Sequence, residues 1–393
     1  MSVLPPTGWT QRADLAQLVA ALGADQIRWV GGAVRDTLLG LPVKDVDAAT
    51  TLLPEQVMDC LRQAGIRAVP TGIEHGTITA VLPGFPVEVT TLRRDVATDG
   101  RRATVAFATD WRDDAARRDF TINALYADPV TLAVTDYFDG LTDLAARRVR
   151  FIGDPAARIH EDHLRILRYY RFQARFGAAL DPAAEAACAQ LAPTLKGLSR
   201  ERVAMELLNL LGLPDPATTV QRMERVGVLD HVLPERASGG TGALTGLTAW
   251  EHAHGIAPDA LRRLSALLPA DPRVADQAGA RLRLSTVQRK RLVLAAGRDG
   301  TDEPRALAYR LGRAEALDRL ALANADPAPL TGWDIPRFPL KGGAIVARGV
   351  QAGPEVARVL RMVEDRWIAA GFPEGDQVQR LLDAELDDIV RPE

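Results

Sequence analysis

Two aspartates one residue apart, Asp45 and Asp47, stand at the start of a short β-type run in the sequence KDVDAAT. Side chains alternate faces along a strand, so both carboxylates are expected on one face while Val46 points into the core. Neighbouring carboxylates repel each other unless a cation lies between them, and a site made only of oxygen ligands favours Mg²⁺. The spacing therefore predicts a magnesium site, with a solvated edge strand as the alternative.

A glycine pair, Gly31 and Gly32, separates the expected strand IRWV from a helix that ends at Gly40. Glycines at such a turn let the backbone approach a ligand, and the N–H groups at a helix start attract phosphate oxygens. Alone, the pair indicates only a tight turn. Beside carboxylates that hold a metal it favours nucleotidyl transfer, in which a hydroxyl is activated and a leaving pyrophosphate is stabilised.

A third carboxylate is expected from a neighbouring strand. Glu88 alternates with Val87 and Val89 in the run VEVTTL, which is rich in β-branched residues. An ordinary outward-facing strand residue would give the same pattern, so spacing alone does not decide the role of Glu88.

The elements that must position these residues change character near residue 150. Up to that point short β-type runs alternate with helical segments, and beyond it the pattern is helical almost throughout. Asp154 can cap, and Pro155 can open, a helix that is expected to run on through the sequence RYYRFQARF. The sequence thus predicts an α+β head followed by an elongated helical part.

Two glycine-rich runs divide the helical part. The run from Pro234 to Gly246 is expected to be a loop, and a softer break is expected at 341–354. The predicted domains therefore cover 1–150, 151–235 and 236–393.

Composition narrows the class of protein. The chain has 393 residues, 47% hydrophobic and 25% charged, which is typical of folded soluble proteins. Its two cysteines, Cys60 and Cys188, form neither a disulfide framework nor a zinc motif, so a cytoplasmic location is expected. No leader and no apolar run that could span a membrane is predicted, so no membrane partner is expected.

Five segments, in order along the chain, resemble the motifs of the polymerase-β-like nucleotidyltransferases. The closer resemblance is to the class II tRNA nucleotidyltransferases, or CCA-adding enzymes, and their bacterial poly(A) polymerase relatives. GGAVRD with DVD resembles the metal and triphosphate motif, RRDFTINAL (117–125) the ribose motif, and DYFDGLTDL (136–144) the hinge motif. EDHLRILR (161–168) resembles the nucleotide-selecting motif, and SRERVAME (199–206) the helix that steadies the neck. A weaker likeness to the tail segment follows at 340–367.

The resemblance implies a head with a mixed antiparallel sheet and helices, followed by an all-α neck, body and tail. It implies template-independent addition of CCA to the 3′ end of tRNA from CTP and ATP, with two Mg²⁺ ions and release of pyrophosphate. Asp45 and Asp47 would hold the metal, and Glu88 would assist in activating the hydroxyl. The implied nucleotide-binding residues are Gly31, Gly32, Arg35, Arg117, Arg118, Asp119, Asp162, Arg165, Arg168 and Arg171.

The helix after Pro155 has side chains suited to choosing a base. An aspartate only accepts hydrogen bonds and an arginine only donates them. Cytosine and adenine both present an amino donor beside a ring acceptor, which suits Asp162 and Arg165, whereas uracil and guanine reverse that pattern. A surface ion pair between Asp162 and Arg165 is the alternative. Helical spacing predicts that one stripe of this helix is buried, made of Ile159, His163, Ile166, Tyr170 and Ala174. It predicts a polar face made of Arg158, Asp162, Arg165 and Tyr169.

Arginines upstream are the expected clamps on the triphosphate or ribose. Arg35 and Arg118 are the first candidates because a guanidinium fork matches phosphate oxygens and keeps its charge. Arg117 and Asp119 are second candidates, and Asn123 is expected to hold its local turn by hydrogen bonds.

Clusters of arginine make RNA the expected macromolecular partner. The stretch 145–175 carries an excess of arginine, and the run RLRLSTVQRKRL carries Arg281, Arg283, Arg289, Lys290 and Arg291 without an acid. Such clusters bind RNA backbone by releasing counterions, although a solvated helix face gives the same pattern. Three histidines, His231, His252 and His254, lack the order of a metal-dependent phosphohydrolase and are interpreted as structural or surface residues.

Three rival functions remain open at this point. A poly(A) polymerase and a transferase that adds only CC or only A share the motifs, although the stretch RRDVATDGRRATVAFATDW resembles the full flexible loop of the CCA-adding enzymes, and IEHGTITAV (73–81) their head strand. A non-catalytic RNA-binding protein on the same scaffold is a rival of another class, and intact acidic motifs argue against it.

Overall fold

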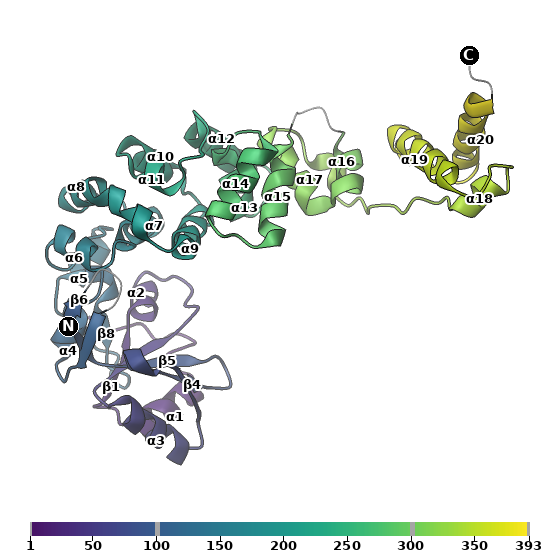
Figure 1. The fold of residues 1–393 in the computed structure, drawn as a ribbon. Helices are drawn as coiled ribbons and strands as arrows, with labels where there is room; N and C mark the ends of the chain where they lie inside the picture. Colours follow the sequence, from purple (N-terminus) through teal and green to yellow (C-terminus); the bar gives the residue numbers. More distant parts are fainter. Residues whose placement is uncertain (1, 99–102, 299–302, 391–393) are drawn as a thin grey trace. The chain divides into compact units, whose positions relative to one another are not determined.

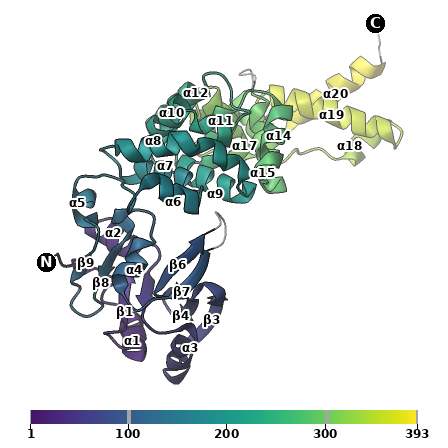
Figure 2. The same ribbon diagram turned by 60° about the vertical axis from the view of Figure 1, so that its left-hand side comes forward.

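The structure, a computed structural model, describes residues 2–98, 103–298 and 303–390. Its internal contacts divide the chain into two units, Met1–Pro234 and Glu235–Glu393, shown in Figure 1 and turned in Figure 2. This division falls beside the boundary expected near 235. The finer division at 150, between head and neck, stays a prediction because both parts belong to the first unit.

The first unit is built on a seven-stranded sheet with the strand order β3-β4-β5-β2-β1-β8-β9. Neighbouring strands are antiparallel except β2 and β5, which are parallel, so the sheet is of the mixed kind that was expected. The strands are β1 (Ile27–Val30), β2 (Asp47–Thr50), β3 (Arg67–Gly72), β4 (Thr77–Val81), β5 (Val87–Thr91), β8 (Leu125–Ala127) and β9 (Val134–Asp136).

A separate two-stranded sheet, β6 (Arg93–Thr98) with β7 (Ala103–Phe107), occupies most of the stretch that resembles the flexible loop. Backbone pairing extends from Arg93 opposite Phe107 to Thr98 opposite Ala103. The connection itself, 99–102, lies outside the described residues. The described part of this stretch is therefore a β-hairpin.

The helices of the first unit lie at two levels around the sheet. In both views α2 lies on the side of the sheet toward α6–α9, whereas α1 and α3 pack together at the opposite end. The helices are α1 (Ala13–Leu22), α2 (Gly32–Leu38), α3 (Pro54–Gln63), α4 (Trp111–Ala116), α5 (Gly140–Ala145), α6 (Pro155–Glu161), α7 (Arg165–Phe176), α8 (Pro182–Leu191), α9 (Arg200–Leu211), α10 (Ala217–Arg225) and α11 (Val228–Val232), with short 3₁₀ turns η1 (Ile73–His75), η2 (Thr121–Asn123) and η3 (Ala192–Gly197).

The segment that resembles the hinge motif is a tightly closed turn onto α5. Asp136 accepts hydrogen bonds from the backbone N–H groups of Phe138, Gly140 and Leu141 at 2.9–3.1 Å. A Cβ on Gly140 would lie 2.3 Å from the carbonyl oxygen of Thr121. Only glycine therefore allows α5 to approach η2, which forms the end of the segment Arg117–Asn123.

The second unit is helical, and its start corrects one expectation. The glycine-rich run 234–246 is a loop only as far as Gly239, because α12 begins at Gly240. A Cβ on Gly240 would lie 2.7 Å from the carbonyl oxygen of Leu267, so this glycine serves close packing of two helices. The helices are α12 (Gly240–Ala253), α13 (Ala260–Leu267), α14 (Pro272–Arg281), α15 (Thr286–Ala296), α16 (Pro304–Leu311), α17 (Arg313–Leu322), α18 (Gly342–Val346), α19 (Pro354–Ala369) and α20 (Asp376–Val390), with the 3₁₀ turn η4 (Ala328–Leu330).

A buried ionic network joins four of these helices. Glu251 on α12 accepts from Arg262 at 2.7 Å and from Arg263 at 2.8 Å. Arg262 also donates to Asp318 on α17 at 2.9 Å, and Asp318 accepts from Arg291 on α15 at 2.6 Å. Apart from Arg291, these side chains are almost fully shielded from solvent. Their charges must therefore be satisfied by one another.

Candidate active site

The two aspartates share one face at the start of β2, as the spacing predicts. Asp45 and Asp47 are exposed while Val46 is 1% exposed. The strand itself begins at Asp47, so Asp45 lies just before it rather than inside it. Both aspartates line the same pocket, and the lining residues include no thiol and no imidazole. This donor set suits a hard cation such as Mg²⁺, which commonly uses one or two carboxylates together with substrate phosphates.

The environment of Asp47 favours a proton or a cation on its carboxylate. Although the side chain reaches solvent at the pocket, desolvation by the surrounding protein is the largest cause, and the charges of Glu88 and Asp45 add to it, against the opposing charge of Arg118. Together they raise the pKa of Asp47 to about 6. A carboxylate held at this pKa gains by binding a positive charge that replaces the proton.

Glu88 lies in register with Asp47 on the neighbouring parallel strand β5. Its side chain is exposed between buried Val87 and Val89, as alternation predicts. It is not among the described residues that line the pocket, and within the described ranges no three His, Cys, Asp or Glu side chains form a group that could hold a metal. Glu88 therefore reaches the aspartates through its charge, whereas Asp45 and Asp47 face the pocket directly.

The glycine pair forms the turn between β1 and α2. Gly31 has φ +70°, a backbone conformation that favours glycine. An added Cβ would lie 3.5 Å from the Nη1 of Arg118. Gly31 and Gly32 both line the pocket, so the backbone here is open to a ligand.

The pocket has a volume of about 800 Å³ and lies wholly within the first unit, between the head strands and α7 and α9. Every nucleotide-binding residue predicted from the sequence lines it. The lining residues are Gly31, Gly32, Arg35, Asp45, Asp47, Arg117, Arg118, Asp119, Asn123, Asp162, Leu164, Arg165, Arg168, Arg171, Phe172, Arg175, Arg202, Met205 and Glu206.

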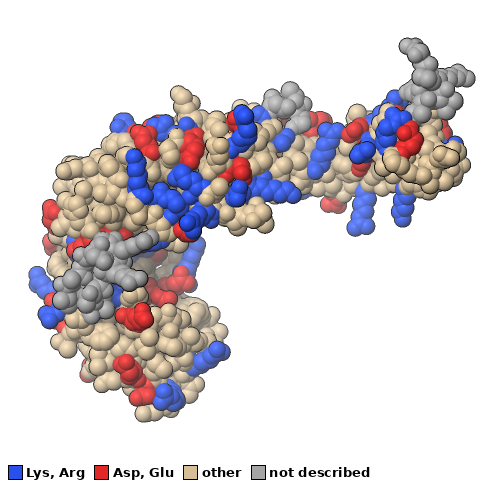
Figure 3. All heavy atoms as spheres, in the orientation of Figure 1, with Lys and Arg blue, Asp and Glu red and all other residues tan. Residues whose placement is uncertain are grey.

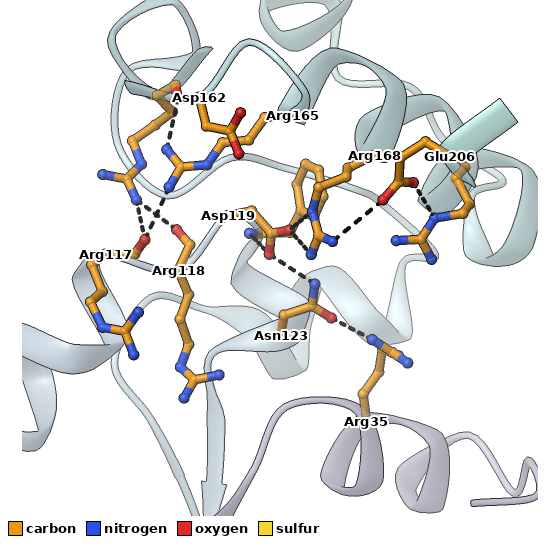
Figure 4. A network of polar contacts seen from close by, with 12 residues as sticks. Arg35, Arg117, Arg118, Asp119, Asn123, Asp162, Arg165, Arg168 and Glu206 are labelled. Carbon is orange, nitrogen blue, oxygen red and sulfur yellow. Dashed lines mark hydrogen bonds and ion pairs between the residues drawn. The ribbon is translucent and has the colours of Figure 1, made fainter. Parts of the chain in front are cut away.

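A chain of polar contacts crosses the pocket, as Figure 4 shows. Arg168 donates to Asp119 at 2.5 and 2.8 Å, and Asp119 accepts from Asn123 at 2.9 Å. Asn123 in turn accepts from Arg35, which is 4% exposed. Burial alone would raise the pKa of Asp119, but the charge of Arg168 and these hydrogen bonds lower it to about 2. Asn123 thus links two predicted site residues besides holding its own turn.

Arg117 and Arg118 share one buried carboxylate. Asp114 on α4 pairs with Arg117 at 2.7 Å and with Arg118 at 3.1 Å, and it also accepts from the hydroxyl of Tyr126 at 2.6 Å. Burial opposes ionisation of Asp114, but the charges of Arg118 and Arg117 hold its pKa below the usual value. Asp114 therefore holds both guanidinium groups in a fixed orientation.

The helix expected to run unbroken from Pro155 is two helices. Asp154 caps α6 through the N–H of Ala157 at 2.7 Å, as predicted, but α6 ends at Glu161 and α7 begins at Arg165. Asp162 is extended, with φ −150° and ψ 104°. The periodicity hides this break because the apolar positions on both sides remain in phase.

The burial of side chains along α6 and α7 agrees only in part with the predicted faces. Tyr169, expected on the polar face, is 0% exposed and packs against Phe151 with ring centroids 5.9 Å apart. Ile159, Ile166 and Tyr170 are buried as expected, whereas His163 and Ala174 are only half-buried. The spacing along the helix was therefore right for Ile159, Ile166 and Tyr170 and wrong for Tyr169.

Among the described residues, Asp162 and Arg165 do not pair with each other through their side chains; each side chain has a different partner. Asp162 accepts from Arg202 on α9 at 2.8 Å and from the N–H of Leu164 at 3.1 Å. Arg165 donates to Glu161 at 2.5 Å and to the carbonyl oxygen of Arg158 at 2.7 Å. In the part of the chain that the structure describes, the ion pair weighed between Asp162 and Arg165 is not formed. Both side chains line the pocket.

Several residues of the pocket were not anticipated from the sequence. Glu206 on α9 accepts from Arg171 at 2.6 Å and lies 3.7 Å from Arg168. Arg175 donates to Asp36 on α2 at 2.9 Å. Glu206 and Arg202 belong to the segment SRERVAME, so its charged residues at helical spacing were the available signal. For Arg175 the sequence offers only the regular arginine spacing along α7.

The basic run of the second unit is less free than its sequence indicates. Arg281 pairs with Glu235 at 2.5 Å, Arg289 with Asp276 at 2.7 Å, and Arg291 with Asp318 at 2.6 Å. On the face shown in Figure 3, acidic and basic side chains lie side by side along this unit. Lys290 and Arg283 are exposed. RNA binding by this run stays a prediction, and Lys290 and Arg283 are its most accessible members.

Comparison with known proteins supports the same family over most of the chain. Residues 27–150 match the model of the poly A polymerase head domain, and residues 177–239 match that of a probable RNA and SrmB-binding site of polymerase A. The mitochondrial CCA tRNA nucleotidyltransferase 1 of Danio rerio is 36% identical over 366 residues, covering 87% of this chain and 83% of the relative. The human protein of the same name is 33% identical over 377 residues, covering 88% and 84%.

Solved structures show the same fold. The Bacillus stearothermophilus CCA-adding enzyme in complex with CTP superposes with a TM-score of 0.76 at 26% identity, covering 97% of this chain and 100% of that one. The Thermotoga maritima CCA-adding enzyme complexed with tRNA gives a TM-score of 0.72 at 19% identity, covering 99% and 100%. Nowhere in the described ranges does a helix combine the length and apolar character needed to cross a membrane.

Proposed function

This chain belongs to the family of class II CCA tRNA nucleotidyltransferases, and on that premise we propose that it adds CCA to the 3′ end of tRNA without a template. CTP and ATP are the substrates and pyrophosphate is the leaving group. The observation that carries the proposal is one pocket that is lined both by Asp45 and Asp47 and by Asp162 and Arg165. A metal-type carboxylate pair and a base-selecting pair thus face the same space.

Asp45 and Asp47 are the proposed ligands of the metal. Mg²⁺ ions bound there would neutralise charge on the attacking hydroxyl and on the leaving pyrophosphate. The raised pKa of Asp47 supports this role because the protein stabilises positive charge at that carboxylate. Glu88, in register with Asp47, is proposed to assist in activating the hydroxyl of the RNA. Its place outside the pocket lining assigns it an indirect part.

Asp162 and Arg165 are proposed to read the Watson–Crick edge of the incoming base. Arg202 leaves the acceptor character of Asp162 unchanged, and Glu161 holds Arg165 as a donor. A pair of fixed acceptor and fixed donor suits cytosine and adenine and leaves buried groups unpaired with uracil or guanine. Because Arg202 holds Asp162 and Glu161 holds Arg165, selection of the base by hydrogen bonding is favoured over a flexible surface contact.

The remaining arginines are proposed to bind the triphosphate and ribose. Arg35, Arg117, Arg118, Arg168 and Arg171 line the pocket, and the backbone at Gly31 and Gly32 is open beside them. Asp119 is proposed to act with Arg168 in this set. Guanidinium groups suit this role because they bind phosphate oxygens with two N–H groups and keep their charge.

The tRNA is proposed to bind along the helical part, with Lys290 and Arg283 as the first residues to test. The cytoplasm is the proposed location, from cysteine usage, although the relatives from fish, mouse and human carry mitochondrial names. Addition of only CC or only A, or of a poly(A) tail, is the alternative outcome of the same chemistry.

Incorporation on tRNA that lacks its last three nucleotides tests the proposal. With CTP and ATP together, sequenced products should end in CCA; with CTP alone they should end in CC, and UTP or GTP should give no product. Runs of adenosine would instead identify a poly(A) polymerase. Asp45→Ala should abolish incorporation and pyrophosphate release while tRNA binding persists. Normal turnover in that variant would refute the assignment of Asp45.

A further inference from the structure

One apolar side chain of the pocket is not explained by metal, phosphate or edge recognition. Met205 lies on α9 between two contacts with the base-selecting region. Arg202, one turn before it, contacts Asp162 at 2.8 Å, and Glu206, next to it, contacts Arg171 at 2.6 Å. Residues at positions i, i+3 and i+4 share one side of a helix, so Met205 faces the pocket along the stretch between those contacts.

Met205 differs from the other apolar side chains of the pocket in its exposure. It is 52% exposed, whereas Leu164 and Phe172 are 3% and 5% exposed. Leu164 and Phe172 belong to the hydrophobic core and only border the pocket. Among the described lining residues, Met205 alone offers a large apolar surface to a ligand.

We propose that Met205 is the apolar contact on which the face of a nucleobase lies while Asp162 and Arg165 bind its edge. The inference rests on the proposed function and adds a residue that positions the base. Edge hydrogen bonds leave both faces of a planar base open to water, and a thioether contacts aromatic faces favourably. Methionine has an unbranched, flexible side chain, so it can contact a pyrimidine and a purine in turn.

The base has two possible sources with the same chemistry. It belongs either to the incoming nucleotide or to the last nucleotide of the RNA. Binding of CTP, ATP and inorganic tripolyphosphate to the full-length protein, measured by calorimetry, separates the base from the phosphates. Met205→Ala should weaken CTP and ATP binding roughly five-fold and leave tripolyphosphate binding unchanged if the base is that of the nucleotide.

If the base belongs to the RNA, the same variant should instead weaken binding of tRNA ending in an added C, relative to tRNA cut back before the CCA end. Met205→Leu, which keeps an apolar side chain of similar size, should stay near the parent in both arms, and Met205→Gln should resemble the alanine variant. Val130→Ala is a matched control, since Val130 is 68% exposed and lies outside the pocket.

Equal binding of nucleotides and of both RNAs by the parent, Met205→Ala and Met205→Gln would overturn the inference. A parent protein that binds nucleotides yet adds no residues to tRNA would instead refute the proposed function, and the calorimetric comparison would still decide the role of Met205.

Discussion

Asp36 on α2 and Arg175 in the last turn of α7 form an ion pair at 2.9 Å across 139 residues of sequence. Asp36 also pairs with Arg35 at 2.7 Å. One buried carboxylate therefore connects Arg35, which is proposed to bind the triphosphate, to the end of α7. The two parts of the pocket are thereby joined by a direct contact of side chains as well as by the chain.

Removing this contact should affect nucleotide binding more than turnover. Arg175→Gln removes a charged hydrogen bond to a buried carboxylate, with an expected loss of about 1 kcal/mol in unfolding free energy because Arg175 is partly exposed. The KM for CTP and ATP should rise while kcat changes little, since Asp36, which also holds Arg35, loses its contact with α7. Steady-state kinetics and denaturant unfolding measure both. Arg310→Gln, at a pair whose side chains are 53% and 68% exposed, should leave both unchanged.

The Asp119 carboxylate should make stability depend on pH in the acid range. Its pKa is about 2 in the folded protein against an ordinary value of 3.8. A lowered pKa contributes stability above the unfolded value, and this stability is lost as the pH falls through the folded value. About 2 kcal/mol should therefore disappear between about pH 4 and pH 2.

Asp119→Asn tests that dependence. The difference in unfolding free energy between the parent and this variant should be largest near neutral pH and shrink as the pH falls below about 4. A difference that stays constant over this range would contradict the assignment. Asp113→Asn, at an exposed position on α4, is the matched control.

Asp162→Asn should relax the choice of base. An amide presents a donor as well as an acceptor, so it can face the carbonyl of uracil or guanine. The ratio of kcat/KM for UTP to that for CTP should rise roughly ten-fold. Incorporation assays with each of the four nucleotides measure the ratio. An unchanged ratio with normal folding would remove Asp162 from base selection.

The buried network of the second unit should be sensitive to the loss of one charge. Glu251→Gln removes the negative charge that Arg262 and Arg263 share in the interior, and the expected loss is about 3–5 kcal/mol in unfolding free energy. Asp365→Asn, at an exposed ion pair, should cost less than about 0.5 kcal/mol. Thermal unfolding distinguishes the two, and equal effects would argue against a cooperative network.

Two glycines should respond in opposite directions to alanine. Gly140→Ala drives a Cβ against the carbonyl oxygen of Thr121, so unfolding free energy should fall by about 1–3 kcal/mol. Gly242 lies inside α12 with no atom within 4 Å of a built Cβ. Gly242→Ala should therefore raise stability by about 0.5–1 kcal/mol. Denaturant unfolding of both variants checks the contrast.

Local patterns predicted much of the fold. Alternation at Val87–Val89 and around Val46 follows from the geometry of a strand, and the structure has it. The cap at Asp154 is a contact between residues three apart, so the sequence holds all the information needed. The expected α+β class and the expected family were confirmed.

Long-range pairing was not predictable in the same way. The break between α6 and α7 leaves the apolar positions in phase, so no periodicity reveals it. The partner of Arg175 is 139 residues away, and those of Arg281 and Arg291 are 46 and 27 residues away. A run of arginines without acids nearby in sequence can thus be largely neutralised by acids that the fold brings to it.

Every arginine that lines the pocket already has a carboxylate partner: Asp36 for Arg35 and Arg175, Asp114 for Arg117 and Arg118, Glu161 for Arg165, Asp119 for Arg168, Glu206 for Arg171, and Asp162 for Arg202. The phosphates of a nucleotide that binds there therefore meet guanidinium groups whose charge is already balanced, and they compete with the resident carboxylates for these groups. A monatomic anion such as chloride has no pair of oxygens to match two N–H groups of a guanidinium, so ligands that carry phosphate compete better for these arginines.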